Sequence, residues 1–109
     1  MAEVIKSLKV KTGTVTRVHK ELNMYQKEQA KELARVEKMK SENAEFHDIK
    51  QAENVLHEAE MMIPETQQRL EAAFADIQSY LADNLTDIPE GAELQAAKEI
   101  ISLVQTTLQ

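Results

Sequence analysis

Apolar residues recur in steps of three and four over roughly the first forty positions, the spacing that gathers side chains on one face of an α-helix. The pattern predicts a helix from about Val4 to Glu42. Its apolar stripe weakens in the second half, where Gln26, Gln29 and Glu32 occupy positions that should be apolar. The residues of the predicted stripe are Val4, Ile5, Leu8, Val15, Val18, Leu22, Tyr25, Leu33, Val36 and Met39.

A second helix is predicted from about residue 48 to residue 84, after a break at Asn43–His47. Asp48 with Gln51 three residues later resembles a capping box, in which a side-chain oxygen satisfies an unpaired backbone N–H. The predicted helix carries a seven-residue apolar repeat, which is typical of antiparallel helix packing. The repeat is Ile49, Leu56, Ile63, Leu70 and Ile77, flanked by Ala52, Ala59, Ala73 and Leu81.

A third helix is predicted from about residue 88 to residue 108. Asp87, Pro89 and Glu90 read as an acidic cap, a first-turn proline and a third-position glutamate. The predicted apolar face is Leu94, Ala97, Ile101, Val104 and Leu108. Together the patterns predict an all-α fold, a three-helix bundle in one domain over residues 1–109.

The lengths of the three predicted helices are unequal. At 1.5 Å per residue, the first two should reach roughly 55–60 Å and the third roughly 30 Å. Because short loops make neighbouring helices antiparallel, the third should cover only the start of the first helix and the end of the second. A spectrin-type scaffold bundle, the alternative architecture, should have three helices of similar length.

Composition agrees with helices. Two Gly, two Pro and 4% aromatic residues leave little material for strand turns or a β-sandwich core. With no cysteine, the chain offers no disulfide, thiol nucleophile or Cys-ligated metal. No apolar run approaches the ~18 residues of a membrane span and no signal-peptide core is present, so we expect a cytoplasmic protein that does not enter a membrane.

Charge is distributed unevenly along the chain. The net charge is −6, yet residues 1–40 hold ten basic and five acidic residues, with no acid between Glu3 and Glu21. Such a helix either pairs with acidic neighbours in its own bundle or draws an acidic partner. Nucleic acid is not the expected partner, because the basic stretch lacks interleaved aromatic residues and the whole protein is acidic.

Catalytic patterns are weak. None of the three histidines follows a glutamate at the spacing used by di-metal bundles. Glu53 and His57 lie one helical turn apart and could share a metal, but a solvated pair on the helix surface is the simpler interpretation. There is no Gly-rich phosphate loop and no Ser-His-acid spacing. The sequence therefore predicts no catalytic residue, no metal site and no cofactor.

Two residues run against helix propensity. Gly13 costs about 1 kcal/mol relative to Ala in a helix interior, too little to break a packed helix. Pro64 removes a hydrogen bond to the Glu60 carbonyl within the apolar repeat. It either only curves the helix or exposes a binding surface. Met61 and Met62 precede it, and because consecutive residues cannot both face one seam, at least one should point outward.

The segment around Pro64 carries a family resemblance. Met61-Met62-Ile63-Pro64-Glu65 followed by Gln68-Arg69-Leu70-Glu71-Ala72-Ala73 resembles the signature of the tubulin-binding cofactor A family. Three further blocks are similar in the same order. They are Lys11-Thr12-Gly13 with Arg17 and Lys20-Glu21, then Glu37-Lys38-Met39-Lys40, then Asp48-Ile49-Lys50-Gln51.

The resemblance implies a tubulin-folding chaperone that captures β-tubulin after its release from the chaperonin, before heterodimer assembly. It also implies binding through helix surfaces, with β-tubulin and other folding cofactors as candidate partners and association with the cytoskeleton. Members are monomers or homodimers, and this sequence does not decide between them. The residues we expect to contact the partner are Lys11, Arg17, Lys20, Lys50, Met62, Pro64 and Arg69. The alternatives are a scaffold or trafficking-adaptor bundle and, from the Glu53–His57 pair, a metalloenzyme.

Overall fold

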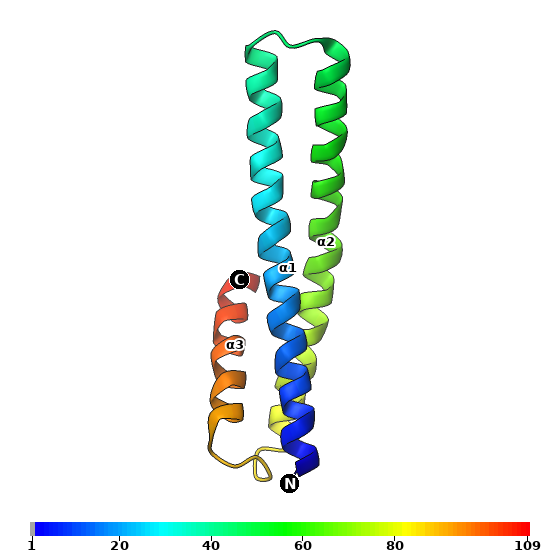
Figure 1. The fold of residues 1–109 in the computed structure, drawn as a ribbon. Helices are drawn as coiled ribbons and strands as arrows, with labels where there is room; N and C mark the ends of the chain where they lie inside the picture. Colours follow the sequence, from blue (N-terminus) through cyan, green and yellow to red (C-terminus); the bar gives the residue numbers. More distant parts are fainter. Residues whose placement is uncertain (1) are drawn as a thin grey trace. The chain divides into compact units, whose positions relative to one another are not determined.

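Three helices make up the secondary structure of residues 2–109, which are the residues that the computed structural model describes (Figure 1). They are α1 (Ala2–Ser41), α2 (Phe46–Asp83) and α3 (Ala92–Leu108). No strand is present within residues 2–109, so the predicted all-α, three-helix fold is confirmed. Helix α3 has 17 residues against 40 and 38 in α1 and α2, so the three lengths are not those of a spectrin-type bundle.

The described chain divides into two compact units. One, here the three-helix unit, contains the residues up to Lys20 together with Gln68–Gln109, and the other, here the hairpin unit, is Glu21–Gln67. The three-helix unit therefore holds all of α3 with the beginning of α1 and the end of α2. The hairpin unit holds only α1 and α2 segments, which run antiparallel and are joined by residues 42–45 (Figure 1). The single-domain expectation stays a prediction, and its first residue lies outside the described residues.

The three-helix unit is held by an apolar core with polar links around it. The Tyr80 hydroxyl donates to the Val4 carbonyl at 3.1 Å, and His19 Nε2 lies 3.0 Å from Thr107 Oγ1. Full burial of one such aliphatic side chain contributes roughly 1.5–3 kcal/mol, so the apolar core outweighs these links. Its buried apolar residues are Leu8, Val15, Val18, Leu70, Ile77, Ile88, Leu94, Ala97, Ile100 and Val104.

The hairpin unit has a thinner seam that includes polar residues. Its buried apolar residues are Leu22, Val36, Ala52 and Ala59, with Glu32 and Thr66 buried among them. The prediction that Leu33 belongs to the apolar stripe is wrong: Leu33 is 45% exposed, whereas Glu32 is 7% exposed. Steps of seven from Tyr25 reach Glu32 and Met39, so the helix geometry places Glu32 on the seam and Leu33 beside it.

Helix α3 begins four residues later than predicted. Residues 88–91 form a bend, and Gly91 occupies the N-cap position without a side-chain cap. Ile88 precedes Pro89, and a residue before proline is disfavoured in the α-helical region. Ile88 instead buries its side chain, with 7% exposed. Within α3, Ile100 is buried and Ile101, the predicted core residue, is half-buried.

Helix α2 begins two residues earlier than predicted. The Glu45 carbonyl accepts the bond from the Ile49 N–H at 3.0 Å, so Asp48 lies in the first turn rather than at the cap. An acidic residue there still complements the positive end of the helix dipole. Before it, Asn43 adopts a φ of 56° in the turn that follows α1.

Candidate partner-binding surfaces

Lys11 lies at the junction of α1 with α2 in the three-helix unit. Its ammonium is 2.7 Å from the Asp76 carboxylate and 5.3 Å from the centroid of the Tyr80 ring. The Lys11 side chain is only 28% exposed, and its charge is already matched within the fold. Of the two interpretations of the basic stretch, pairing inside the bundle therefore holds for this residue.

Arg17 and Lys20 are exposed on α1. Three residues apart, they lie on one face of the helix. Within the described part of the chain neither forms an ion pair. They are thus the two predicted basic contacts of α1 whose charges are open to an acidic partner.

The hairpin unit contains a shallow groove of about 220 Å³ between its two helical segments. Met62 lines it and is half-buried, whereas Met61 is 61% exposed, so the prediction that at least one of the pair points outward is confirmed. Apolar atoms line most of the groove, and two glutamates are among its lining residues. The lining residues are Tyr25, Glu28, Val55, Glu58, Ala59 and Met62.

Helix α2 remains continuous through Pro64, which is exposed. Because proline has no N–H, the Glu60 carbonyl lacks its helical donor. Two residues on, Thr66 is fully buried and its hydroxyl donates to the Met62 carbonyl at 2.7 Å. The proline is therefore accommodated within the helix, with a buried polar side chain one turn after the methionine pair.

The two remaining predicted contacts, Lys50 and Arg69, are exposed on α2, Lys50 in the hairpin unit and Arg69 in the three-helix unit. Lys11, Arg17 and Lys20 also belong to the three-helix unit, and Met62 and Pro64 to the hairpin unit. The structure thus places the predicted contacts in two groups. That any of them contacts a partner stays a prediction.

Two exposed apolar residues of α2 are not predicted as surface features from the sequence. Phe46, the first residue of α2, is 79% exposed, and Val55, in the groove beside Met62, is 40% exposed. A signal was available for Val55, which lies seven residues before Met62 and therefore on the same face of α2. No pattern marked Phe46, because the predicted loop extended past it.

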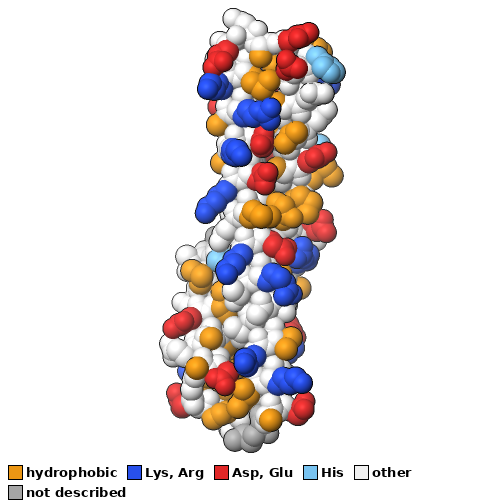
Figure 2. All heavy atoms as spheres, in the orientation of Figure 1, with side chains coloured by type: hydrophobic (Ala, Val, Ile, Leu, Met, Phe, Trp, Pro, Cys, Tyr) orange, Lys and Arg blue, Asp and Glu red, His pale blue; other side chains and the backbone are white. Residues whose placement is uncertain are grey.

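Charged and hydrophobic side chains are interspersed on the face shown in Figure 2, which carries both signs of charge.

The candidate metal pair is Glu53 with His57. Glu53 makes an ion pair with Lys40 at 3.4 Å. Within residues 2–109 no three His, Cys, Asp or Glu side chains gather as metal ligands would. None of the described helices is long and apolar enough to cross a membrane.

Comparison with known proteins covers nearly the whole chain. The family model described as Tubulin binding cofactor A matches residues 3–101. Tubulin-folding cofactor A of Arabidopsis thaliana is 46% identical over 102 residues, covering 93% of this chain and 90% of that protein. Tubulin-specific chaperone A of Homo sapiens is 41% identical over 101 residues, covering 93% of each.

Solved structures agree with these sequence matches. The crystal structure of the Arabidopsis thaliana protein superimposes with a TM-score of 0.88 at 42% identity, covering 97% of this chain and 99% of that one. The structure of human tubulin chaperone cofactor A gives a TM-score of 0.80 at 40% identity, with 94% and 98% covered. With sequence and fold both matched over more than nine-tenths of its length, the chain belongs to the tubulin binding cofactor A family.

Proposed function

We propose that this protein is a tubulin-folding cofactor that captures β-tubulin after the chaperonin releases it and holds it until the heterodimer assembles. The observation that carries the proposal is the family match over residues 3–101. Relatives named as tubulin-specific chaperones align over 93% of the chain, which leaves almost no part of it outside the shared fold. The proposed place of action is the cytoplasm, in association with the cytoskeleton.

Charge supports an acidic client such as β-tubulin. Arg17 and Lys20 present two exposed positive charges on one face of α1, in a stretch without acids between Glu3 and Glu21. Opposite charges on two partners steer their encounter and raise the association rate, an effect that falls as salt screens the charges. We therefore expect binding that weakens with ionic strength.

Helix surfaces supply the rest of the proposed contact. The two connections, residues 42–45 and 84–91, are short, so most of the accessible surface belongs to helices. On α2, Met62 provides an adaptable apolar side chain that lines a groove, and Pro64 is exposed two residues before the buried Thr66. Lys50 and Arg69 extend the proposed α2 contact, and Lys11 contributes through its packing. No nucleotide, metal or catalytic step is needed for this holding function.

The direct test is co-elution of the purified protein with purified β-tubulin on a sizing column coupled to mass measurement. At low salt we expect a complex whose mass also reports whether one or two copies of this chain bind. An acidic globular protein of similar size to β-tubulin serves as the control for non-specific attraction. Absence of a complex at low salt would overturn the proposed function.

A further inference from the structure

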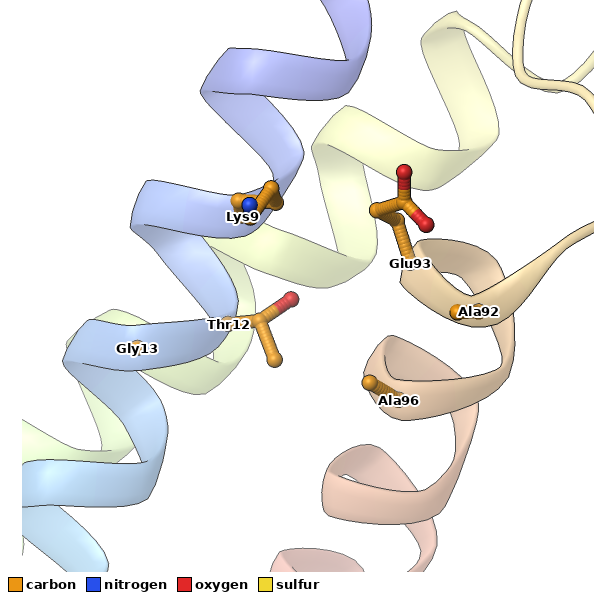
Figure 3. Close-up of a pocket in the computed structure, with 6 residues that line it drawn as sticks. All are labelled: Lys9, Thr12, Gly13, Ala92, Glu93 and Ala96. Atoms are coloured by element: carbon orange, nitrogen blue, oxygen red, sulfur yellow. The ribbon is translucent and has the colours of Figure 1, made fainter.

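A groove runs between α1 and α3 within the three-helix unit. It consists of two adjoining hollows of about 460 and 260 Å³, which share Thr12 and Ala96. Figure 3 shows the larger hollow, in which the Thr12 side chain points from α1 toward α3 and the Ala96 side chain points back. The smaller hollow continues along α3 to Leu103, which is 55% exposed.

Three of the six residues that line the larger hollow are glycine or alanine. Gly13 lies on the α1 side, with Ala92 and Ala96 one turn apart on the α3 side (Figure 3). Small residues spaced by four let a second helix backbone approach closely. From Ala92 to Leu103 the groove extends about 16 Å along α3, the length of three helical turns.

Neither the backbone conformation nor the packing of the described residues requires a glycine at position 13. Its φ is not positive, and a Cβ built on it would meet nothing within 4 Å. A glycine in a helix interior nevertheless costs about 1 kcal/mol relative to alanine. The fold would thus be more stable with alanine here, and the property that glycine alone offers is room for another chain to approach the helix backbone.

The two walls of the groove carry opposite charges. Lys9 from α1 and Glu93 from α3 stand at the same end of the larger hollow (Figure 3), and Glu99 lies in the smaller one on the α3 side. Lys9 and Glu93, both among the described residues, do not form an ion pair with each other. An occupant that places an acidic side chain toward α1 and a basic one toward α3 would complement both walls.

We infer that this groove receives a helix of the client, an amphipathic segment of about three turns in β-tubulin. Its face over Gly13 carries small side chains, its acidic edge faces Lys9, and its basic edge faces Glu93 and Glu99. The inference rests on the proposed function and adds the surface and the kind of client segment. It also gives Gly13 a role, because close helix approach needs the missing Cβ.

Two substitutions in the groove, Ala96→Leu and Gly13→Ala, test the inference by their effect on binding to purified β-tubulin. Ala96→Leu fills the space shared by both hollows and should weaken binding about tenfold, as expected when extra methylenes block a close contact. Ala75→Leu is the matched control, since Ala75 is exposed on α2 in the same unit and lines neither hollow. It should change the affinity less than about twofold, as for a substitution away from a contact.

Gly13→Ala separates binding from folding. Because nothing lies within 4 Å of the added Cβ, the variant should unfold at a temperature several degrees higher, roughly what 1 kcal/mol gives in a domain of this size. Its affinity for β-tubulin should nevertheless fall about threefold, as for a small loss of packing at a contact. A merely structural glycine would not move these two quantities in opposite directions.

The outcomes distinguish the two proposals. If wild-type protein binds β-tubulin and both groove variants bind equally well, the groove is not the docking site and the proposed function stands. If wild-type protein does not bind, the proposed function and the inference fall together. If the groove variants lose only self-association in sedimentation, the occupant is a second copy of this chain, and the inference is overturned.

Discussion

Lys11 on α1 and Asp76 on α2 are joined by an ion pair of 2.7 Å, and the same ammonium stands 5.3 Å from the centroid of the Tyr80 ring. Tyr80 in turn donates its hydroxyl to the Val4 carbonyl. These contacts connect the start of α1 to the end of α2 outside the apolar core. Of the three predicted basic contacts on α1, Lys11 is therefore engaged within the fold, whereas Arg17 and Lys20 are exposed and form no ion pair within the described residues.

Removing the Lys11 charge should lower stability modestly. Because the side chains of Lys11 and Asp76 are 28% and 57% exposed, water screens the pair, and Lys11→Gln should cost about 0.5–1.5 kcal/mol with the ring contact included. Urea unfolding followed by circular dichroism measures this, with exposed Lys6→Gln as the control. A double-mutant cycle with Asp76→Asn that shows no coupling would contradict a contribution from the pair.

Reversing the charges of Arg17 and Lys20 should weaken β-tubulin binding while leaving helicity intact. Both residues are exposed, so Arg17→Glu with Lys20→Glu removes the open positive charge without disturbing the core. We expect at least about a tenfold loss at low salt that shrinks as salt is raised. The matched control is Lys27→Glu with Lys31→Glu, an equal change of net charge at exposed α1 positions in the hairpin unit. A loss of helicity in the first variant would show that these residues are structural.

Replacing the buried Glu32 by an apolar residue should stabilise the hairpin unit. Glu32 is 7% exposed, and among residues 2–109 its one ion pair is a 3.4 Å contact with Arg35, itself 56% exposed at the side chain. Replacing a poorly compensated buried charge by an apolar residue of similar volume is often neutral or stabilising by about 1–4 kcal/mol. Glu32→Leu should therefore raise the midpoint of thermal unfolding, and Arg35→Ala should lower it. A lower midpoint for Glu32→Leu would contradict this expectation and show that the Glu32 carboxylate stabilises the hairpin unit.

Pro64 should lower the stability of α2 and at the same time contribute to the surface that binds β-tubulin. Pro64→Ala restores the donor for the Glu60 carbonyl and should stabilise the chain by about 1–3 kcal/mol. Because we propose that this part of α2 contacts β-tubulin, affinity should fall at the same time. Glu65→Ala, at the neighbouring exposed position, is the control for loss of a surface side chain. Unchanged affinity with raised stability would leave Pro64 with only a bend-forming role.

Helix number, length and family could be predicted because they follow from local periodicity and a short specific block of sequence. Hydropathy gives a wrong prediction where an apolar residue lies beside the buried face of the helix and a polar residue lies on it. Leucine at position 33 is more apolar than glutamate at position 32, yet the seven-residue spacing puts Glu32 on the seam. The cap pattern at Asp87 predicts a helix start near residue 88, but Pro89 disfavours the helical conformation at Ile88, and α3 begins only at Ala92.

The candidate site could be predicted only in part, for a different physical reason. Whether a lysine serves a partner or its own fold depends on residues far away in sequence, and Asp76 is 65 positions from Lys11. The α1–α3 groove likewise depends on which small residues face each other across two helices. Gly13 was visible in the sequence as a helix-weakening residue, but the open space beside it was not.

The unequal burial in the two units has a consequence for motion. Among the described residues, ten buried apolar side chains lie in the three-helix unit and four in the hairpin unit, so local opening should require less free energy in Glu21–Gln67. Amide protons of that segment should exchange with deuterated water sooner than those around Val15, Ile77 and Ala97. A client that contacts Met62 would then slow this exchange as it binds. Part of its binding free energy is thus spent on ordering the segment, which keeps the complex releasable.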